Sequence, residues 1–398
     1  MPGVDVTLLL SPRVTARRKG AVAILVLLAL ASGAYALHDR ARGASFVVQA
    51  ANLQGVVRSL AELGTVAVTE MPARVPWRGG EIGGRWYVPA RPSGRPVLVV
   101  PGVHAAGIDE PRLVAFARDL ASMGHPVLTA RLPDLERYAL STRSTDMIED
   151  AAAWLADRPE HRVADGRVGV MGISFAGGLA VVASGRPQVR ERVAFVMSFG
   201  GHGDLPRTLR YLCTGVQPTG ERRPPHDYGV AIILLGAAPL VVPPEQAQPL
   251  RGAILAFLEA SHLDMVDKAR AKLAFDRARA LAAGLEEPAR TLMGYVNDRN
   301  VTALGPILLP HVSVIAGDEA LSPVRAAAPA AAVYLLHGTD DNVIPAVESA
   351  LLAASLRAKG VTVRHLPTPL ITHAEVDRSA ALRAFWDLAG FWGRLLHE

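Results

Sequence analysis

The stretch RVGVMGISFAGG, residues 167–178, joins an apolar run to a serine that small residues flank on both sides. The apolar run predicts a buried strand, and the Ala- and Gly-rich residues after Ser174 predict the start of a helix. A sharp strand-to-helix turn lifts a serine hydroxyl clear of the backbone, and it requires small residues because strand and helix approach closely. The pattern is typical of a nucleophile elbow, although Ala176 stands where glycine is usual. A serine among small residues also occurs as an ordinary helix N-cap, so Ser174 needs partners before it has a role.

Strand and helix patterns alternate on both sides of this stretch. Predicted strands cover 66–69, 84–88, 96–100, 126–130, 167–171, 193–198, 333–336 and 361–366, and predicted helices cover 45–63, 111–123, 144–157, 346–359 and 379–397. Such alternation predicts an α/β fold: a mostly parallel sheet with helices on both faces. The alternation stops over residues 202–330, where helical segments (252–260 and 264–283) and paired prolines predict a helical cap insert. The core is therefore expected in two parts, 45–201 and 331–398.

The insert contains one strongly apolar run, Val230–Val242, which resembles a short membrane span. It has thirteen residues, Gly236 and Pro239 interrupt it, and Pro243-Pro244 bounds it. A membrane-spanning helix needs about 20 apolar residues. The run therefore favours a buried helix of the cap.

A longer apolar segment, residues 20–37, precedes the core and carries no charged side chain. A helix of this length rises roughly 27 Å, which suffices to cross the hydrocarbon layer of a bilayer. The basic run Arg17-Arg18-Lys19 before it favours a cytoplasmic tail over 1–19 and places the rest of the chain outside. We expect a single-pass membrane anchor with an extracytoplasmic catalytic domain. The alternative is a cleaved signal peptide and a secreted or periplasmic protein, because Ala34-Tyr35-Ala36 fits the small-x-small cleavage pattern.

The basic excess of the chain lies in this leader. Residues 1–43 carry six basic and two acidic side chains, a net charge of +4, and the whole chain carries +5. A nucleic-acid-binding protein shows its basic excess on the folded domain. The charge distribution therefore excludes nucleic acid as a partner. The one cysteine, Cys213, has no partner for an intramolecular disulfide and is expected to be a small buried hydrophobe.

Two later loops supply the partners that a nucleophilic serine requires. A serine attacks only when a base removes its proton, and an acid must hold that base in the right tautomer. The run YLLHGTDDNVIP, residues 334–345, is a strand followed by a turn with Asp340 and Asp341, and His373 follows the last predicted strand. The carboxyl ends of parallel strands lie at one edge of a sheet, so both loops are expected near Ser174.

The chain resembles the α/β-hydrolases, a broad group of esterase, dienelactone-hydrolase and peptidase-like enzymes. The resemblance rests on VVPGVH at 99–104, on the Ser174 turn, on the acidic loop and on the His373 loop. It covers roughly residues 60–200 and 330–398 and leaves the insert at the position of the family's lid.

The resemblance implies a covalent acyl-serine mechanism. Ser174 would be the nucleophile, His373 the base and Asp341 the acid. Asp341 is preferred to Asp340 because family members commonly show His-Gly-x-x-Asp, a hydrophobic residue and then proline. The expected substrate is a small-molecule ester or related acyl compound, with hydrolysis as the expected reaction.

The resemblance also implies an oxyanion hole. Its expected donors are the backbone N–H groups of Phe175 and Val103. Two departures from the family pattern concern this region, since Ala176 replaces the last glycine of the elbow and Pro101 replaces a common histidine.

Other expectations concern the pocket, cofactors and alternatives. His104 and His202 follow strands at the same edge and are possible pocket residues, although a structural hydrogen bond is an alternative for each. No metal-ligand spacing and no phosphate-binding or dinucleotide-binding motif is found, so neither a metal nor a cofactor is expected. An acyltransferase on the same fold and a non-catalytic binding protein stay open as alternatives. The sequence does not indicate an oligomeric state.

Overall fold

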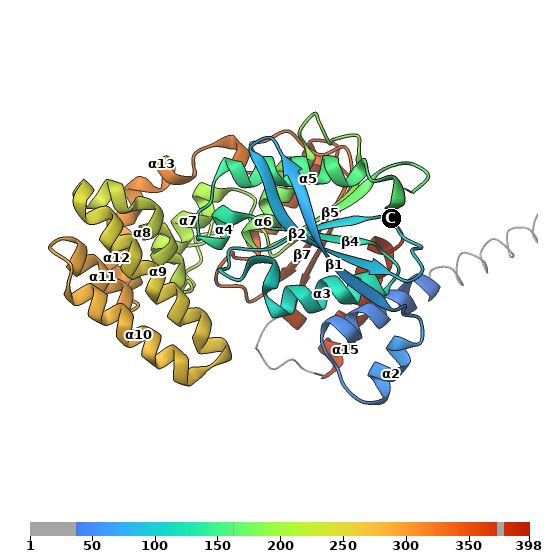
Figure 1. Ribbon diagram of the computed structural model, residues 1–398, viewed down its shortest axis with the longest axis horizontal. Coiled ribbons are helices and arrows are strands. Elements are labelled where there is room, and N and C mark those ends of the chain that lie inside the picture. Colours follow the sequence, from blue (N-terminus) through green and yellow to red (C-terminus); the bar gives the residue numbers. More distant parts are fainter. Residues whose placement is uncertain (1–36, 162, 372–377) are drawn as a thin grey trace, which may run out of the picture.

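One eight-stranded sheet forms the centre of the computed structural model, which describes residues 37–161, 163–371 and 378–398 (Figure 1). The strands lie in the order β1-β2-β4-β3-β5-β6-β7-β8. Pairing is parallel from β4 to β8 and antiparallel for β1 with β2 and for β2 with β4. The strands are β1 (Val68–Trp77), β2 (Gly80–Pro89), β3 (Val97–Val100), β4 (Val127–Ala130), β5 (Val168–Ile173), β6 (Val193–Phe199), β7 (Ala332–Gly338) and β8 (Val363–Thr368). The predicted mostly parallel sheet is confirmed.

Helices cover both faces of the sheet because successive side chains of the central strands point into two different apolar cores. In β5, Val168 and Val170 belong to one core and Met171 to the other. The first face carries α4 (Pro133–Glu136), α5 (Thr142–Ala156), α6 (Phe175–Ser184) and α14 (Val347–Ala358); the second carries α3 (Pro111–Ser122), α15 (Arg378–Leu395) and a helix over 37–50. The predicted arrangement of helices on both faces is therefore confirmed.

The hairpin of β1 and β2 is longer than the predicted strands over 66–69 and 84–88. Glycines, prolines and charged residues occupy much of both strands, so neither reads as an apolar run. Arg78 in the turn donates hydrogen bonds to the carboxylates of Glu149 and Asp150 of α5, with N–O distances of 2.5 Å and 2.7 Å. These long-range ion pairs tie the hairpin to the core, and local sequence does not reveal them.

The segment between β6 and β7 contributes no strand to the sheet among its described residues. It forms α7 (Leu205–Thr214), α8 (Tyr228–Val241), α9 (Pro244–Val266), α10 (Lys268–Ala283), α11 (Ala289–Asn297), α12 (Val301–Leu308) and α13 (Val312–Ala316). We call α8 to α13 the cap, which stands to one side of the sheet (Figure 1). The apolar run 230–242 lies in α8 and is largely buried, as predicted for a cap helix.

The first long helix of the cap differs from the prediction. α9 begins at Pro244 rather than at Gly252, because proline is favoured in the first turn of a helix. The break before α10 falls at Asp267, whose side chain accepts hydrogen bonds from the N–H groups of Ala269 and Arg270. This N-terminal capping by Asp267 sets the start of α10, whereas apolar periodicity alone placed the boundary between the two helices at residues 261–263.

The predicted helical stretch over 45–63 is two helices, one over 37–50 and α2 (Val56–Glu62). Gly55, with φ 81°, precedes α2 and permits the change of direction between them. The helix over 37–50 packs closely on α15, since a Cβ added at Gly43 would lie 1.9 Å from the carbonyl oxygen of Ala389. The leader thus continues into a helix that is part of the core.

No helix formed by the described residues is both long and apolar enough to cross a membrane. The expected anchor over residues 20–37 lies outside the described residues except for Leu37, which begins the helix over 37–50.

Candidate active site

Ser174 occupies a strained turn between β5 and α6. Its backbone has φ 55° and ψ −133°, a conformation that side chains other than glycine rarely adopt. The Ser174 N–H donates to the carbonyl oxygen of Phe199 at 2.7 Å, which fixes the turn against the end of β6. The hydroxyl is therefore presented from a sharp strand-to-helix turn and not from a relaxed helix N-cap, and its side chain makes no cap hydrogen bond.

The small residues around the serine are required by close backbone approach. A Cβ added at Gly172 would lie 2.2 Å from the carbonyl oxygen of Ala176, and one added at Gly177 would lie 2.5 Å from Ser198 Oγ. Ala176 itself is buried inside α6 and is not among the described residues with positive φ, so a glycine is not needed there. The departure from the usual elbow pattern is explained by this geometry.

The two aspartates after β7 point to different partners. Asp340 is bound to Arg223 through a 3.1 Å ion pair, and its side chain is 49% exposed. Asp341 Oδ1 accepts hydrogen bonds from the N–H groups of Val343 and Ile344 at 2.8 Å and 2.9 Å. The second oxygen, Oδ2, lies 3.6 Å from where a Cβ would sit at Gly200, just beyond β6. Asp341 is therefore the aspartate held at the edge of the sheet where β5 and β6 end.

The buried side chain of His337 holds this acidic turn in place. Its Nε2 bonds to the carbonyl oxygen of Ile344 at 2.7 Å and lies 3.5 Å from Asp341 Oδ2. The ring is fully buried, so it holds the loop and is not available to substrate.

The expected base, His373, lies outside the described residues. The chain up to Ile371 approaches the acidic loop, since a Cβ added at Gly338 would lie 3.0 Å from the Ile371 carbonyl oxygen. Ile371 also lines the same cavity as Ser174. The role of His373 stays a prediction.

The two residues expected to supply the oxyanion donors both lie near Ser174. Phe175 is the first residue of α6, and the first N–H groups of a helix have no partner within it. Val103 follows Gly102, where an added Cβ would lie 3.1 Å from the Cβ of Ser174. The loop after β3 therefore runs directly against the serine, despite the proline at position 101.

A cavity of about 840 Å³ adjoins Ser174. This volume falls within the usual range of small-molecule sites, which is about 300–1,000 Å³. Its walls come from the loop after β3, from the cap and from the second face of the sheet, and they include Val103, His104, Tyr228, Leu258, His262, Phe46 and Trp392.

His104 lines this cavity, as the sequence suggested, and joins the core to the cap. Its Nε2 lies 2.9 Å from Nδ1 of His262 on α9, and its Nδ1 accepts a hydrogen bond from the N–H of Ala106. Because Nδ1 is an acceptor, a neutral His104 carries its proton on Nε2 and donates it to His262. Burial, together with the adjacent His262, lowers the pKa of His104 and favours this neutral form.

His202 lies beneath the site and not in the cavity. It is fully buried, its Nε2 bonds to the carbonyl oxygen of Leu321 at 2.7 Å, and its ring centroid is 5.6 Å from that of Phe175. Burial lowers its pKa, so the ring is neutral and donates from Nε2. The expected pocket role of His202 therefore gives way to its alternative, a structural hydrogen bond.

The chain is similar to several proteins of known structure. No family model matches the chain, and no curated protein matches it. Among solved structures, it is similar to an esterase from Pyrobaculum calidifontis, with 15% identity, 89% of this chain and 92% of that chain covered, and a TM-score of 0.45. It is also similar to the rice cell wall degrading esterase LipA from Xanthomonas oryzae, with 16% identity, 83% and 90% covered, and a TM-score of 0.49. At these sequence identities and TM-scores, the likeness adds no argument to the one that the order of the strands provides.

The order of the strands, the serine turn after β5 and the acidic turn after β7 agree with the resemblance stated from the sequence. The observed fold is the mostly parallel sheet with helices on both faces that this resemblance implies. The cap contributes cavity residues that the sequence did not indicate, among them Tyr228, His262 and Arg299. His262 meets His104 across 158 positions of the chain, and no local pattern signals such a contact.

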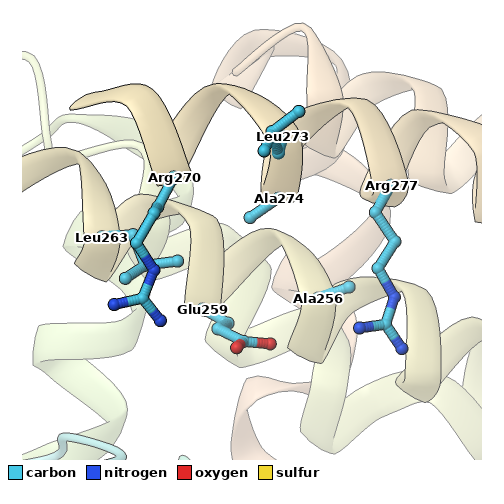
Figure 2. Close-up of a pocket in the computed structure, with 7 residues that line it drawn as sticks. All are labelled: Ala256, Glu259, Leu263, Arg270, Leu273, Ala274 and Arg277. Carbon is cyan, nitrogen blue, oxygen red and sulfur yellow. The ribbon is translucent and has the colours of Figure 1, made fainter. Parts of the chain in front are cut away.

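A second, smaller hollow of about 260 Å³ lies between α9 and α10 of the cap, and Figure 2 shows the residues that line it. Arg270 and Arg277 of α10 flank Glu259 of α9 there. No serine, cysteine or histidine is among the described residues that line it, so it offers no nucleophile or general base. The candidate active site is the larger cavity at Ser174.

Proposed function

We propose that this chain is a serine hydrolase that cleaves a carboxylic ester or a related acyl substrate through an acyl-serine intermediate. The observation that carries the proposal is Ser174, held in a strained strand-to-helix turn beside a cavity of about 840 Å³. Such strain is kept where it serves function, because it costs of order 1–3 kcal/mol. An ordinary helix N-cap needs none of it.

In this mechanism His373 takes the proton of Ser174 during attack on the acyl carbon and returns it to the leaving alcohol. Asp341 orients the imidazole and stabilises its charged form. Its Oδ1 is already held by the N–H groups of Val343 and Ile344, which leaves Oδ2 for the histidine. Water then attacks the acyl-serine, and the same base takes its proton.

The tetrahedral oxyanion formed in each step needs preorganised donors. The backbone N–H groups of Phe175 and Val103 would be these donors; Phe175 starts α6 directly after Ser174, and the loop that carries Val103 runs against the serine at Gly102, which supports this assignment. Loss of one donor typically lowers the rate by about 10²–10³.

Covalent labelling tests the nucleophile. We expect a fluorophosphonate probe to label the purified protein at Ser174, and p-nitrophenyl butyrate to be hydrolysed. Ser174→Ala should abolish both, whereas Ser313→Ala, at an exposed serine of the cap, should change neither. Labelling that persists in Ser174→Ala would overturn the proposal.

The acid is tested with a matched pair of variants. Asp341→Asn should lower kcat by about 10³–10⁴, because an amide favours the wrong tautomer of the base. Asp340→Asn should change kcat by less than about threefold, since Asp340 faces Arg223 and solvent. The opposite order of effects would move the acid by one residue.

We further propose that residues 20–37 anchor the protein in a membrane, with the catalytic domain on the outer side. Eighteen uncharged residues after a basic run support this proposal. The N-terminal residue of protein isolated from membranes provides the test. A mature chain that begins near Leu37 would show cleavage instead.

A further inference from the structure

Two chemically different groups of residues line the cavity at Ser174, and we call them its two ends. Cap residues line one end, and the helix over 37–50 with α15 lines the other. In Figure 1 the cap lies to the left of the sheet, whereas this helix, drawn in blue, lies to the lower right beside α15. Ser174 lines the same cavity as both ends, so an ester bound at the serine can extend one part toward each of them.

The end away from the cap is apolar. The lining residues from the helix over 37–50, from the turn directly after it and from α15 are all apolar: Phe46, Val47, Ala50, Ala51, Leu388 and Trp392. The Phe46 ring lies 4.4 Å from that of Trp392 and 5.7 Å from that of Phe116, which also lines the cavity. We call this end the apolar arm. It offers hydrocarbon contact and no charged partner from these two helices.

The cap end is polar and carries both signs of charge. Arg299 forms a 2.7 Å ion pair with Asp227, and His226 lies 3.0 Å from the same carboxylate. These partners hold the pKa of Asp227 at about 2. Ser261 and Asp264 of α9 line the same end. Hydroxyl or amide groups of a substrate find donors and acceptors here.

We propose that the acyl group of the substrate is a long hydrocarbon chain that occupies the apolar arm, and that the polar alcohol group of the ester lies at the cap end. This inference rests on the proposed function, because it places the ester bond at Ser174. The substrate class is thus an amphipathic lipid ester and not a short-chain ester.

The apolar arm opens at the surface. Ala50 and Ala51 are exposed and also line the cavity, so they form its mouth. Close to them in the chain, α2 exposes an apolar face, with Val56 77%, Leu60 61% and Leu63 81% exposed. These three residues are spaced i, i+4 and i+7, which places them on one side of a helix.

α15 extends this apolar surface. Gly43 meets Ala389 and Gly393 meets Asp39, so α15 runs antiparallel to the helix over 37–50. Its exposed apolar residues Leu382 and Trp386 therefore lie toward the end of that helix at which the mouth opens. We call the exposed apolar residues of α2 and α15 the rim.

The occupant of the rim is a lipid bilayer. The uncharged segment over residues 20–37 ends where the helix over 37–50 begins, which keeps the rim within one short helix of the proposed anchor. An exposed apolar surface with a tryptophan suits the interface between membrane and water. The acyl chain would enter the apolar arm from the bilayer.

A matched pair of variants on one helix tests the apolar arm. Ala50→Trp narrows the mouth, whereas Ala41→Trp adds the same ring nine residues earlier, on the opposite side of the helix. For Ala50→Trp we expect the ratio of kcat/KM for p-nitrophenyl palmitate to that for p-nitrophenyl butyrate to fall at least about tenfold. About two methylene groups excluded from an apolar site account for that factor. Ala41→Trp should leave both rates at the wild-type level.

An unchanged ratio in Ala50→Trp, or an equal loss on both esters, would overturn the inference. A wild-type enzyme that hydrolyses butyrate but has no activity on palmitate would also overturn it. Each of these results leaves the acyl-serine proposal standing, since that proposal fails only if Ser174→Ala retains labelling or activity. The two failures are therefore distinguishable.

A separate experiment tests whether the acyl chain enters from the bilayer. The double variant Leu60→Glu/Leu63→Glu places two charges on the rim, and both positions are exposed, so folding is preserved. With a fluorogenic long-chain ester in phosphatidylcholine vesicles, the rate relative to that on soluble butyrate should fall at least about tenfold. An unchanged ratio of these two rates would show that the acyl chain does not enter from a lipid surface.

Discussion

At the scale of single residues, the geometry of Ser174 depends on neighbours that have no side chain. The φ of 55° at a serine persists only if the surrounding backbone holds it there. Gly172 is the most tightly confined of these neighbours, because an added Cβ would lie 2.2 Å from a carbonyl oxygen, a backbone atom that cannot turn aside.

We therefore expect Gly172→Ala to distort the turn, to lower the free energy of unfolding by about 1–3 kcal/mol and to reduce kcat by about 10². Gly252→Ala is the matched control, because Gly252 lies in α9 with no atom within 4 Å of an added Cβ. It should raise the free energy of unfolding by roughly 0.5–1 kcal/mol and leave kcat unchanged. Urea denaturation and butyrate hydrolysis measure both effects. Wild-type activity in Gly172→Ala would contradict the importance of this close approach.

At the scale of elements, α9 of the cap and the loop after β3 meet through two histidine rings. His262 Nδ1 accepts the proton that a neutral His104 holds on Nε2, across 2.9 Å. Burial and the proximity of His262 both lower the pKa of His104. The ring of a cap helix therefore influences the protonation of the loop that carries Val103.

Removal of His262 should change the pKa of His104 in a defined direction. In His262→Gln the neighbouring imidazole is absent, so the pKa of His104 should rise, while burial still keeps it below its ordinary value. Titration of the His104 ring by NMR in histidine-labelled protein measures the change, and buried His125 serves as the internal control. An unchanged or lowered pKa of His104 in the variant would show that α9 does not influence the loop.

The same scale shows what local patterns can and cannot predict. Strands β3 and β5 to β7 are continuous apolar runs that end in turn residues, so their periodicity predicts them within a few residues. The full length of the β1–β2 hairpin was not predicted, because Arg78 fixes the hairpin through carboxylates of α5, which are distant in the sequence. Cap helices were placed less well, since side-chain capping at Asp267 sets a boundary that apolar spacing does not show.

At the scale of the whole molecule, sequence order predicted the candidate site better than it predicted the cavity. Ser174 and Asp341 follow strands whose carboxyl ends share one edge, so a parallel sheet brings them to it. The cavity instead depends on how the cap and the helix over 37–50 pack against that edge. Contacts such as His104 with His262 and Phe46 with Trp392 join distant segments, and nothing in either segment specifies the other.

Long-range packing also buries histidines, and this gives the molecule an acid-sensitive stability. Burial lowers the pKa of His125 from 6.5 to about 4, even though its Nδ1 donates to the carbonyl oxygen of Arg95. His104 and His202 shift in the same direction. Below pH 6.5 the unfolded chain therefore binds protons that the folded chain excludes, and the stability present above that pH is lost as the pH falls.

We expect the free energy of unfolding to decrease between pH 7.5 and pH 5, with His125 alone contributing about 2 kcal/mol of the loss. Carboxylates do not account for this window, because the pKa values of Asp165 and Asp227 are held at about 2 and their ion pairs persist to lower pH. Urea midpoints at the two pH values measure the loss, and His125→Asn should reduce the difference between them. A midpoint that stays constant or rises on acidification would mean that His125 gains its proton in the folded protein as readily as in the unfolded chain.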